Sequence, residues 1–120
     1  MRSAPTPTLE AVQRVRSRAL GRVRANLHMG LDLRLAFLRT GLGEPHRSAE
    51  ALVGGGPGWS GFDLIEATVR SLMPTWTREG VEGADTIVVD GLADRIGREV
   101  GEEGTVMMQP HVGAWARLGA

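Results

Sequence analysis

The chain has 120 residues, no cysteine, and 14 basic residues against 14 acidic ones, so its formal net charge at pH 7 is zero. This length suits a single domain with its own apolar core, and the absence of cysteine excludes disulfides, thiolate zinc sites and iron–sulfur clusters. The zero net charge hides an asymmetry, because residues 1–47 carry nine arginines and three acids whereas residues 48–120 carry five arginines and eleven acids.

The chain is predicted to begin with a flexible lead-in over residues 1–7, because Pro5 and Pro7 disfavour helix around them. Residues 8–120 are expected to form one compact domain. From residue 9 to residue 26, apolar residues recur at three- and four-residue spacing, which predicts an amphipathic helix.

Arginines gather on this first helix. Arg14, Arg18 and Arg22 follow one another at intervals of four residues and form a stripe away from the apolar face, with Arg24 close behind. An unpaired guanidinium is too costly to bury, so the stripe is expected to face solvent, an anionic partner or an acidic protein surface.

Residues 27–38 can be interpreted in two ways. Six apolar residues alternate with polar or small ones, which favours a half-buried strand. The richness in Leu, Met and Ala favours continuation of the helix instead, although Gly30 would cost about 1 kcal/mol in a helix interior. We favour the strand. The two alternatives differ at Arg34, which faces solvent in a strand and falls in the apolar arc of a helix.

Residues 40–61 are predicted to form a loop region rich in glycine and proline, with a short serine-capped helix over 48–53. The last part of this region, residues 54–61, is a glycine-rich loop. An amphipathic helix then spans residues 62–73 and is ended by Pro74.

Two further strands are predicted, a β-branched run at 86–89 and a second run at 105–109, separated by a helix over 91–100. A helix of this length allows the two strands to be parallel. The expected fold is α+β, or a small α/β domain, with a sheet of about three strands at 27–38, 86–89 and 105–109. So small a sheet leaves room for a strand added by a neighbouring chain.

No motif indicates an enzymatic activity. The glycine-rich loop lacks the Lys-Ser/Thr pair of a phosphate-binding P-loop, and no Gly-x-Ser-x-Gly elbow occurs. The histidines, His28, His46 and His111, are not at metal-ligand spacing. We therefore predict no catalytic residue, no cofactor and no metal. A small enzyme with a site near His46, Trp59 and Asp63 is kept as an alternative.

Trp59, inside the glycine-rich loop, either packs back into the core or projects as an anchor for a partner, since tryptophan is frequent in binding hot spots. We include it with Arg14, Arg18, Arg22 and Arg24 in a predicted interaction surface. The predicted function is that of a non-enzymatic protein–protein interaction subunit or adaptor of a larger assembly, such as a viral or phage structural or connector component. Its partner would be another protein or further copies of the chain. The alternative is a nucleic-acid-binding module that uses the arginine-rich helix.

No stretch approaches the ~20 apolar residues of a membrane-spanning helix, so we expect no membrane association. The absence of cysteine favours a cytoplasmic, or virion-associated, location. Residues 1–30 are rich in arginine and almost free of acids, which leaves an organellar transit peptide as the alternative.

Overall fold

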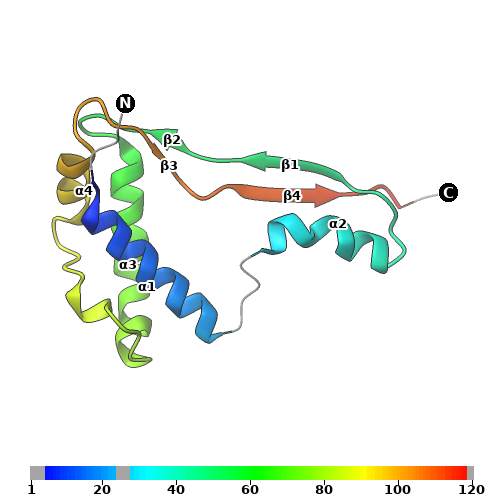
Figure 1. Cartoon of the computed structure of the whole chain (residues 1–120), viewed down its shortest axis with the longest axis horizontal. Coiled ribbons are helices and arrows are strands. Elements are labelled where there is room, and N and C mark those ends of the chain that lie inside the picture. Colours follow the sequence, from blue (N-terminus) through cyan, green and yellow to red (C-terminus); the bar gives the residue numbers. More distant parts are fainter. Residues whose placement is uncertain (1–4, 24–27, 119–120) are drawn as a thin grey trace. The chain divides into compact units, whose positions relative to one another are not determined.

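The computed structural model describes residues 5–23 and 28–118. Within that range the elements follow one another as α1 (Pro7–Arg22), α2 (Met29–Arg39), β1 (His46–Glu50), β2 (Val53–Gly54), α3 (Ser60–Arg78), the 3₁₀ turn η1 (Ala84–Thr86), α4 (Leu92–Val100), β3 (Val106–Met107) and β4 (His111–Trp115) (Figure 1). The strands form two antiparallel pairs, β1 with β4 and β2 with β3. The α+β class expected from the sequence is confirmed.

The described residues group into two compact units. The helical unit comprises residues 5–23 and 53–107 and holds α1, α3, α4, η1 and the β2–β3 pair. The ribbon unit comprises residues 28–52 and 108–118 and holds α2 and the β1–β4 pair.

The apolar core belongs to the helical unit, in which α3 packs against α4 and η1 while α1 packs against α4. Leu92 and Ile96 of α4 lie at its centre and are fully inaccessible to solvent. The predicted amphipathic patterns place these side chains correctly, because each helix turns one apolar stripe toward the others. The buried apolar residues are Leu9, Val12, Val15, Phe62, Ile65, Val69, Trp76, Val81, Ala84, Leu92, Ala93, Ile96, Val100 and Val106.

Two helices of this unit begin at a carboxylate supplied by a neighbouring helix. Glu99 of α4 accepts hydrogen bonds from the amide of Thr8, at 2.8 Å, and from its hydroxyl, at the start of α1. Glu66 of α3 accepts a hydrogen bond from the amide of Ala93 at the start of α4, at 2.9 Å. The first amides of a helix have no partner inside the helix, so these carboxylates take the part of an N-cap side chain.

The prediction that Pro74 ends the helix at residues 62–73 is wrong, because α3 runs to Arg78. Proline lacks the N–H that would bond to the residue four positions earlier, which usually breaks a helix. Here Trp76 lies beyond the proline and is buried in the core. Burial of so large a ring offsets the missing hydrogen bond and holds the last turn in place.

Residues 86–89 do not form the predicted strand. Thr86 ends the 3₁₀ turn, and residues 87–89 are unpaired. The guanidinium of Arg95 donates hydrogen bonds to the carbonyls of Val88 and Asp90, which a neighbouring strand would otherwise satisfy. The expected parallel arrangement with residues 105–109 is therefore absent, and the strand there is confined to Val106–Met107, antiparallel to β2.

The predicted strand at 27–38 is also wrong where the structure describes it, because residues 29–39 form α2. The helix propensity of Leu, Met and Ala outweighs the alternating pattern. Gly30 allows α2 to approach β4 closely, since a Cβ at this position would lie 3.0 Å from Cγ2 of Val112. The short helix expected over 48–53 does not form either, because residues 46–50 pair with β4.

Candidate protein-interaction surface

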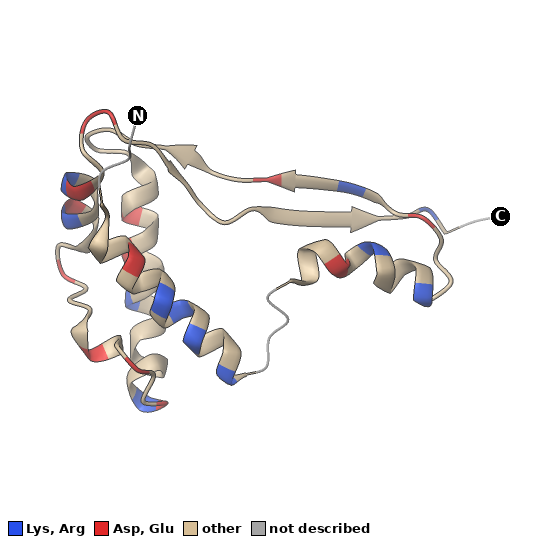
Figure 2. Cartoon of the chain, viewed as in Figure 1, with Lys and Arg blue, Asp and Glu red and all other residues tan. Residues whose placement is uncertain are grey.

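The predicted arginine stripe lies on the exposed side of α1, where Figure 2 shows basic residues following one another along the second half of the helix. Arg14 is exposed and forms no hydrogen bond or ion pair with any described residue. Arg24 falls in residues 24–27, outside the described part of the chain. The structure thus places three of the four predicted arginines.

Two of these arginines bind main-chain carbonyls of their own unit. Nη1 of Arg18 donates to the carbonyl of Glu82 at 3.0 Å, and Nη1 of Arg22 donates to the carbonyl of Glu79, the C-cap residue of α3. Carbonyls at a helix C-terminus carry partial negative charge, so a guanidinium is favourable there. Arg18 and Arg22 therefore connect the second half of α1 to the end of α3 and the turn after it.

Trp59 packs against its own unit. Its indole lies between Gly54 and Gly61, where an added Cβ would come within 2.1 and 2.3 Å of the ring, and it meets Phe62 edge-on with ring centroids 5.1 Å apart. The side chain is half-buried and borders a shallow depression of about 380 Å³ that Asp63 also lines. This packing accounts for Trp59 as a structural residue, and its use as a partner anchor stays a prediction.

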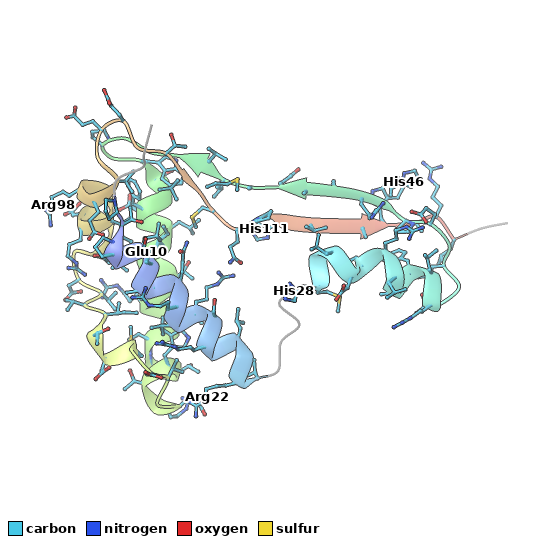
Figure 3. The ribbon with its side chains drawn as sticks, in the orientation of Figure 1. Glu10, Arg22, His28, His46, Arg98 and His111 are labelled. Atoms are coloured by element: carbon cyan, nitrogen blue, oxygen red, sulfur yellow. The ribbon has the colours of Figure 1, made fainter. Side chains whose placement is uncertain are left out.

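The three residues of the alternative enzyme site do not come together within either unit. Trp59 and Asp63 belong to the helical unit, whereas His46 belongs to the ribbon unit. His46 stacks on Trp115, its cross-strand partner, with ring centroids 4.4 Å apart and an interplanar angle of 19°. Figure 3 shows His46 at one end of the β1–β4 pair and His111 at the other. Among the described residues, no group of three or more His, Asp or Glu is arranged to hold a metal ion.

The ribbon unit carries an apolar surface that was not anticipated from the sequence. Helix α2 has apolar residues on two opposite faces and buries none of them. Gly30, Leu33 and Phe37 are partly covered and share the face that meets β4. The opposite face carries the leucine stripe, which we define as Leu31, Leu35, Leu38 and Leu42; these side chains are between 40% and 82% exposed.

The end of α2 fixes the last member of the leucine stripe. Gly41 adopts a φ of +80° and its amide donates to the carbonyl of Leu38 at 3.3 Å, while the amide of Leu42 donates to the carbonyl of Phe37 at 3.1 Å. This pair of bonds is the Schellman motif, in which glycine adopts the left-handed conformation that ends a helix. Leu42 is thereby placed directly after the helical leucines.

An ion pair connects α2 to the segment that leads into β1. Nε of Arg34 donates to Oε1 and Oε2 of Glu44 at 2.7 and 3.0 Å, and both side chains are about half exposed. The hydrogen bond from Arg34 lowers the pKa of the Glu44 carboxyl below its usual range. Arg34 thus lies between the leucine stripe and the face that meets β4, inside the apolar arc that the helical interpretation of its position implied, and Glu44 supplies a charged partner for it there.

More large apolar side chains of the ribbon unit are exposed around these elements. Trp115 at the end of β4 is 52% exposed and Leu118 after it is 84% exposed. Met29 and Leu52 are likewise exposed. A signal for this surface was present in the sequence, because an alternating run of leucines that folds as a helix must display apolar residues on more than one face.

No protein-family model matches this chain, and comparison with curated proteins and with solved structures found no match either. Among the helices of the described residues, none combines the length and the apolar character needed to cross a membrane.

Proposed function

We propose that the protein is a non-enzymatic subunit or adaptor of a larger assembly, and that the ribbon unit makes the protein–protein contact. The observation that carries this proposal is the uncovered apolar surface of that unit. Eight of its large apolar residues are at least 40% exposed, namely Met29, Leu31, Leu35, Leu38, Leu42, Leu52, Trp115 and Leu118.

An exposed surface of this kind is unfavourable in an isolated chain. Contiguous apolar patches on soluble proteins mark interaction sites, because their burial against a partner removes apolar area from water. A pair of strands with one helix has too little core to be stable by itself. A partner that covers the leucine stripe would supply the core that the described ribbon unit lacks.

The nucleic-acid-binding alternative receives less support. Phosphate binding requires arginines that are free to meet the backbone, and Arg18 and Arg22 are already engaged with carbonyls of the helical unit. Arg14 is the described arginine of the stripe that best fits this role. The enzyme alternative receives less still, since His46 lies in a different unit from Trp59 and Asp63.

The proposal also covers the kind of assembly and the location in which the protein acts. By analogy with other small subunits, a viral or phage particle or a cytoplasmic assembly is the setting in which an adaptor of this kind would act. A cysteine-free chain suits either location.

Size-exclusion chromatography with light scattering, at low and high salt and with and without DNA or RNA, tests the proposal. We expect a discrete oligomer that persists at high salt and in a variant with Arg14, Arg18 and Arg22 replaced by glutamine, because the contact is apolar. A chain that stays monomeric, and whose ribbon unit exchanges its amide hydrogens as slowly as α3, would need no partner and would overturn the proposal. Elution with nucleic acid that is lost in the arginine variant would favour the alternative instead.

A further inference from the structure

We propose that the leucine stripe pairs antiparallel with the same stripe of a second copy of the chain. This inference rests on the proposed function, because it names the partner that covers the ribbon unit. Leu31, Leu35, Leu38 and Leu42 follow at spacings of four, three and four residues. That alternation is the repeat of a coiled-coil seam, in which leucines of two helices interlock.

The charged residues beside the leucine stripe favour a second copy of α2 as the partner and an antiparallel orientation of the two helices. Asp32 and Arg39 follow Leu31 and Leu38, each by one residue, so they lie on the same flank of the stripe at opposite ends of α2. Arg34 lies on the other flank, where Glu44 holds it. An antiparallel pairing about a twofold axis brings Asp32 of each copy beside Arg39 of the other, and so makes the same favourable contact twice.

A parallel pairing is unfavourable by the same reasoning. In a parallel seam, each residue on one flank meets the residue five positions later on the opposite flank of the partner helix. Arg34 of each copy would then meet Arg39 of the other, and like charges repel. The flanks of α2 are therefore complementary to a second α2 only when the two helices run in opposite directions.

The contact is expected to be modest in strength. Helix α2 has 11 residues, which corresponds to a length of roughly 16 Å. Such a short seam buries less than the ~800 Å² per partner of a standard interface. Dissociation by dilution in the micromolar range is therefore expected, on the order of the affinity that small interfaces reach.

The first experiment compares two matched variants of the full chain. Leu35 in the stripe and Leu64 on α3 are each 47% exposed and each lie in a helix. We expect Leu35→Ser to raise the dimer dissociation constant in sedimentation velocity at least about tenfold, as for a central interface residue, and Leu64→Ser to leave it unchanged. Equal behaviour of the two variants, or a monomer at every accessible concentration, would overturn the inference. An oligomer that tolerates Leu35→Ser would do so while leaving the proposed function in place.

The second experiment tests orientation by exchanging charges. We expect Arg39→Asp to weaken the dimer several-fold, because it places an acid beside Asp32 of the other copy, and the double variant Asp32→Arg/Arg39→Asp to restore it. Failure of the double variant to recover affinity would contradict the antiparallel arrangement.

Because the chain has no cysteine, a single introduced cysteine can report whether the two α2 helices pair parallel or antiparallel. Antiparallel pairing separates the two copies of residue 31 by roughly 16 Å along the helices, beyond the ~7 Å between Cα atoms that a disulfide can span. A Leu31→Cys variant should therefore stay uncross-linked under mild oxidation, and rapid formation of its disulfide dimer would show a parallel pair.

Discussion

The indole of Trp59 packs against the backbone of Gly54 and Gly61. A Cβ at position 61 would lie 2.3 Å from Cη2 of the indole, and one at position 54 would lie 2.1 Å from Cε2. Neither glycine is needed there for a positive φ. Their role is to leave room for the ring, which explains why the glycine-rich loop can pack closely against the start of α3.

Gly61→Ala should displace the indole of Trp59. We expect the free energy of unfolding to fall by about 1–3 kcal/mol, the usual cost of overpacking, with a change in tryptophan emission, both measured in denaturant titrations. Gly21→Ala is the matched control, since nothing lies within 4 Å of its added Cβ in α1. That control should raise stability by roughly 0.5–1 kcal/mol through helix propensity. Equal effects of the two substitutions would contradict the packing role of Gly61.

The carboxyl of Glu44 reports on the ion pair with Arg34. The hydrogen bond from Arg34 lowers the pKa of Glu44 in the folded chain, and the nearby charges of Arg34 and Arg47 lower it further. Because the folded pKa lies below the unfolded one, the pair contributes stability above the ordinary pKa of a glutamate, and this contribution is lost as the pH falls through the folded pKa. At neutral pH the contribution is fully present.

An NMR titration of the Glu44 side-chain carbon checks this effect. We expect Arg34→Gln to return the pKa of Glu44 toward its ordinary value. Arg47→Gln should have a smaller effect, because its Nη2 lies 3.8 Å from Oε1 of Glu44 and the charge of Arg47 is the weakest of the causes that lower this pKa. A pKa that does not respond to Arg34→Gln would show that the pair is not formed in solution.

At the scale of elements, the helical unit is connected by caps that pass from one helix to the next. Glu99 of α4 binds Thr8 of α1, and Glu66 of α3 binds Ala93 of α4. The N-cap residues themselves, Thr6 and Gly91, form no side-chain cap bond. The first turns of α1 and α4 therefore depend on carboxylates that come into place only when the helices pack together. The formation of these turns is thus coupled to tertiary packing.

Glu99→Ala should loosen the start of α1. We expect a loss of about 1 kcal/mol in the free energy of unfolding, as for removal of an N-cap side chain, with Glu99→Gln losing less because it keeps an acceptor. Glu103→Ala is the control, because Glu103 is exposed and bonds to no other described residue. Circular dichroism during chemical unfolding measures both, and an unchanged midpoint for Glu99→Ala would contradict the cap.

Local patterns in the sequence predict the helices of the helical unit well and its strands poorly. The amphipathic runs at α1 and α4 are sufficient to predict these two helices, because the apolar stripe that each helix buries is continuous along it. Residues 87–89 look like a strand in the sequence, but the guanidinium of Arg95 donates to the carbonyl of Val88, and the amide of Leu92 donates to the carbonyl of Val89. Strand pairing is decided by such non-local partners, which an alternating or β-branched run does not encode.

The candidate interaction surface could likewise be predicted from the sequence only in part. The arginine stripe follows from helical spacing alone, whereas the carbonyls that engage Arg18 and Arg22 belong to residues about 60 positions away and depend on how α1 and α3 pack. The leucine stripe is not apparent from the sequence, because the alternation of its residues also fits a strand. A helix that is apolar on two faces gives the same alternation, and the helical backbone observed over residues 29–39 separates the two interpretations.

At the scale of the whole molecule, apolar burial is divided unevenly between the two units. Of the buried apolar side chains that the structure describes, all but Pro45 belong to the helical unit, while the ribbon unit exposes the leucine stripe and Trp115. Regions with few buried apolar contacts open more readily, because less free energy is lost when their hydrogen bonds break. The ribbon unit is therefore expected to be the less stable part of the chain when no partner covers it.

Hydrogen–deuterium exchange at several protein concentrations tests this division. In dilute solution, the amides of α2, β1 and β4 should exchange faster than those of α3 and α4, since the leucine stripe is then in water. As the concentration rises, protection should increase in the ribbon unit and stay constant in the helical unit, because association stabilises the segments that it covers by mass action. Leu35→Ser should abolish that increase and Leu64→Ser should retain it. Uniform protection of both units at the lowest concentration would mean that the ribbon unit is stable without a partner.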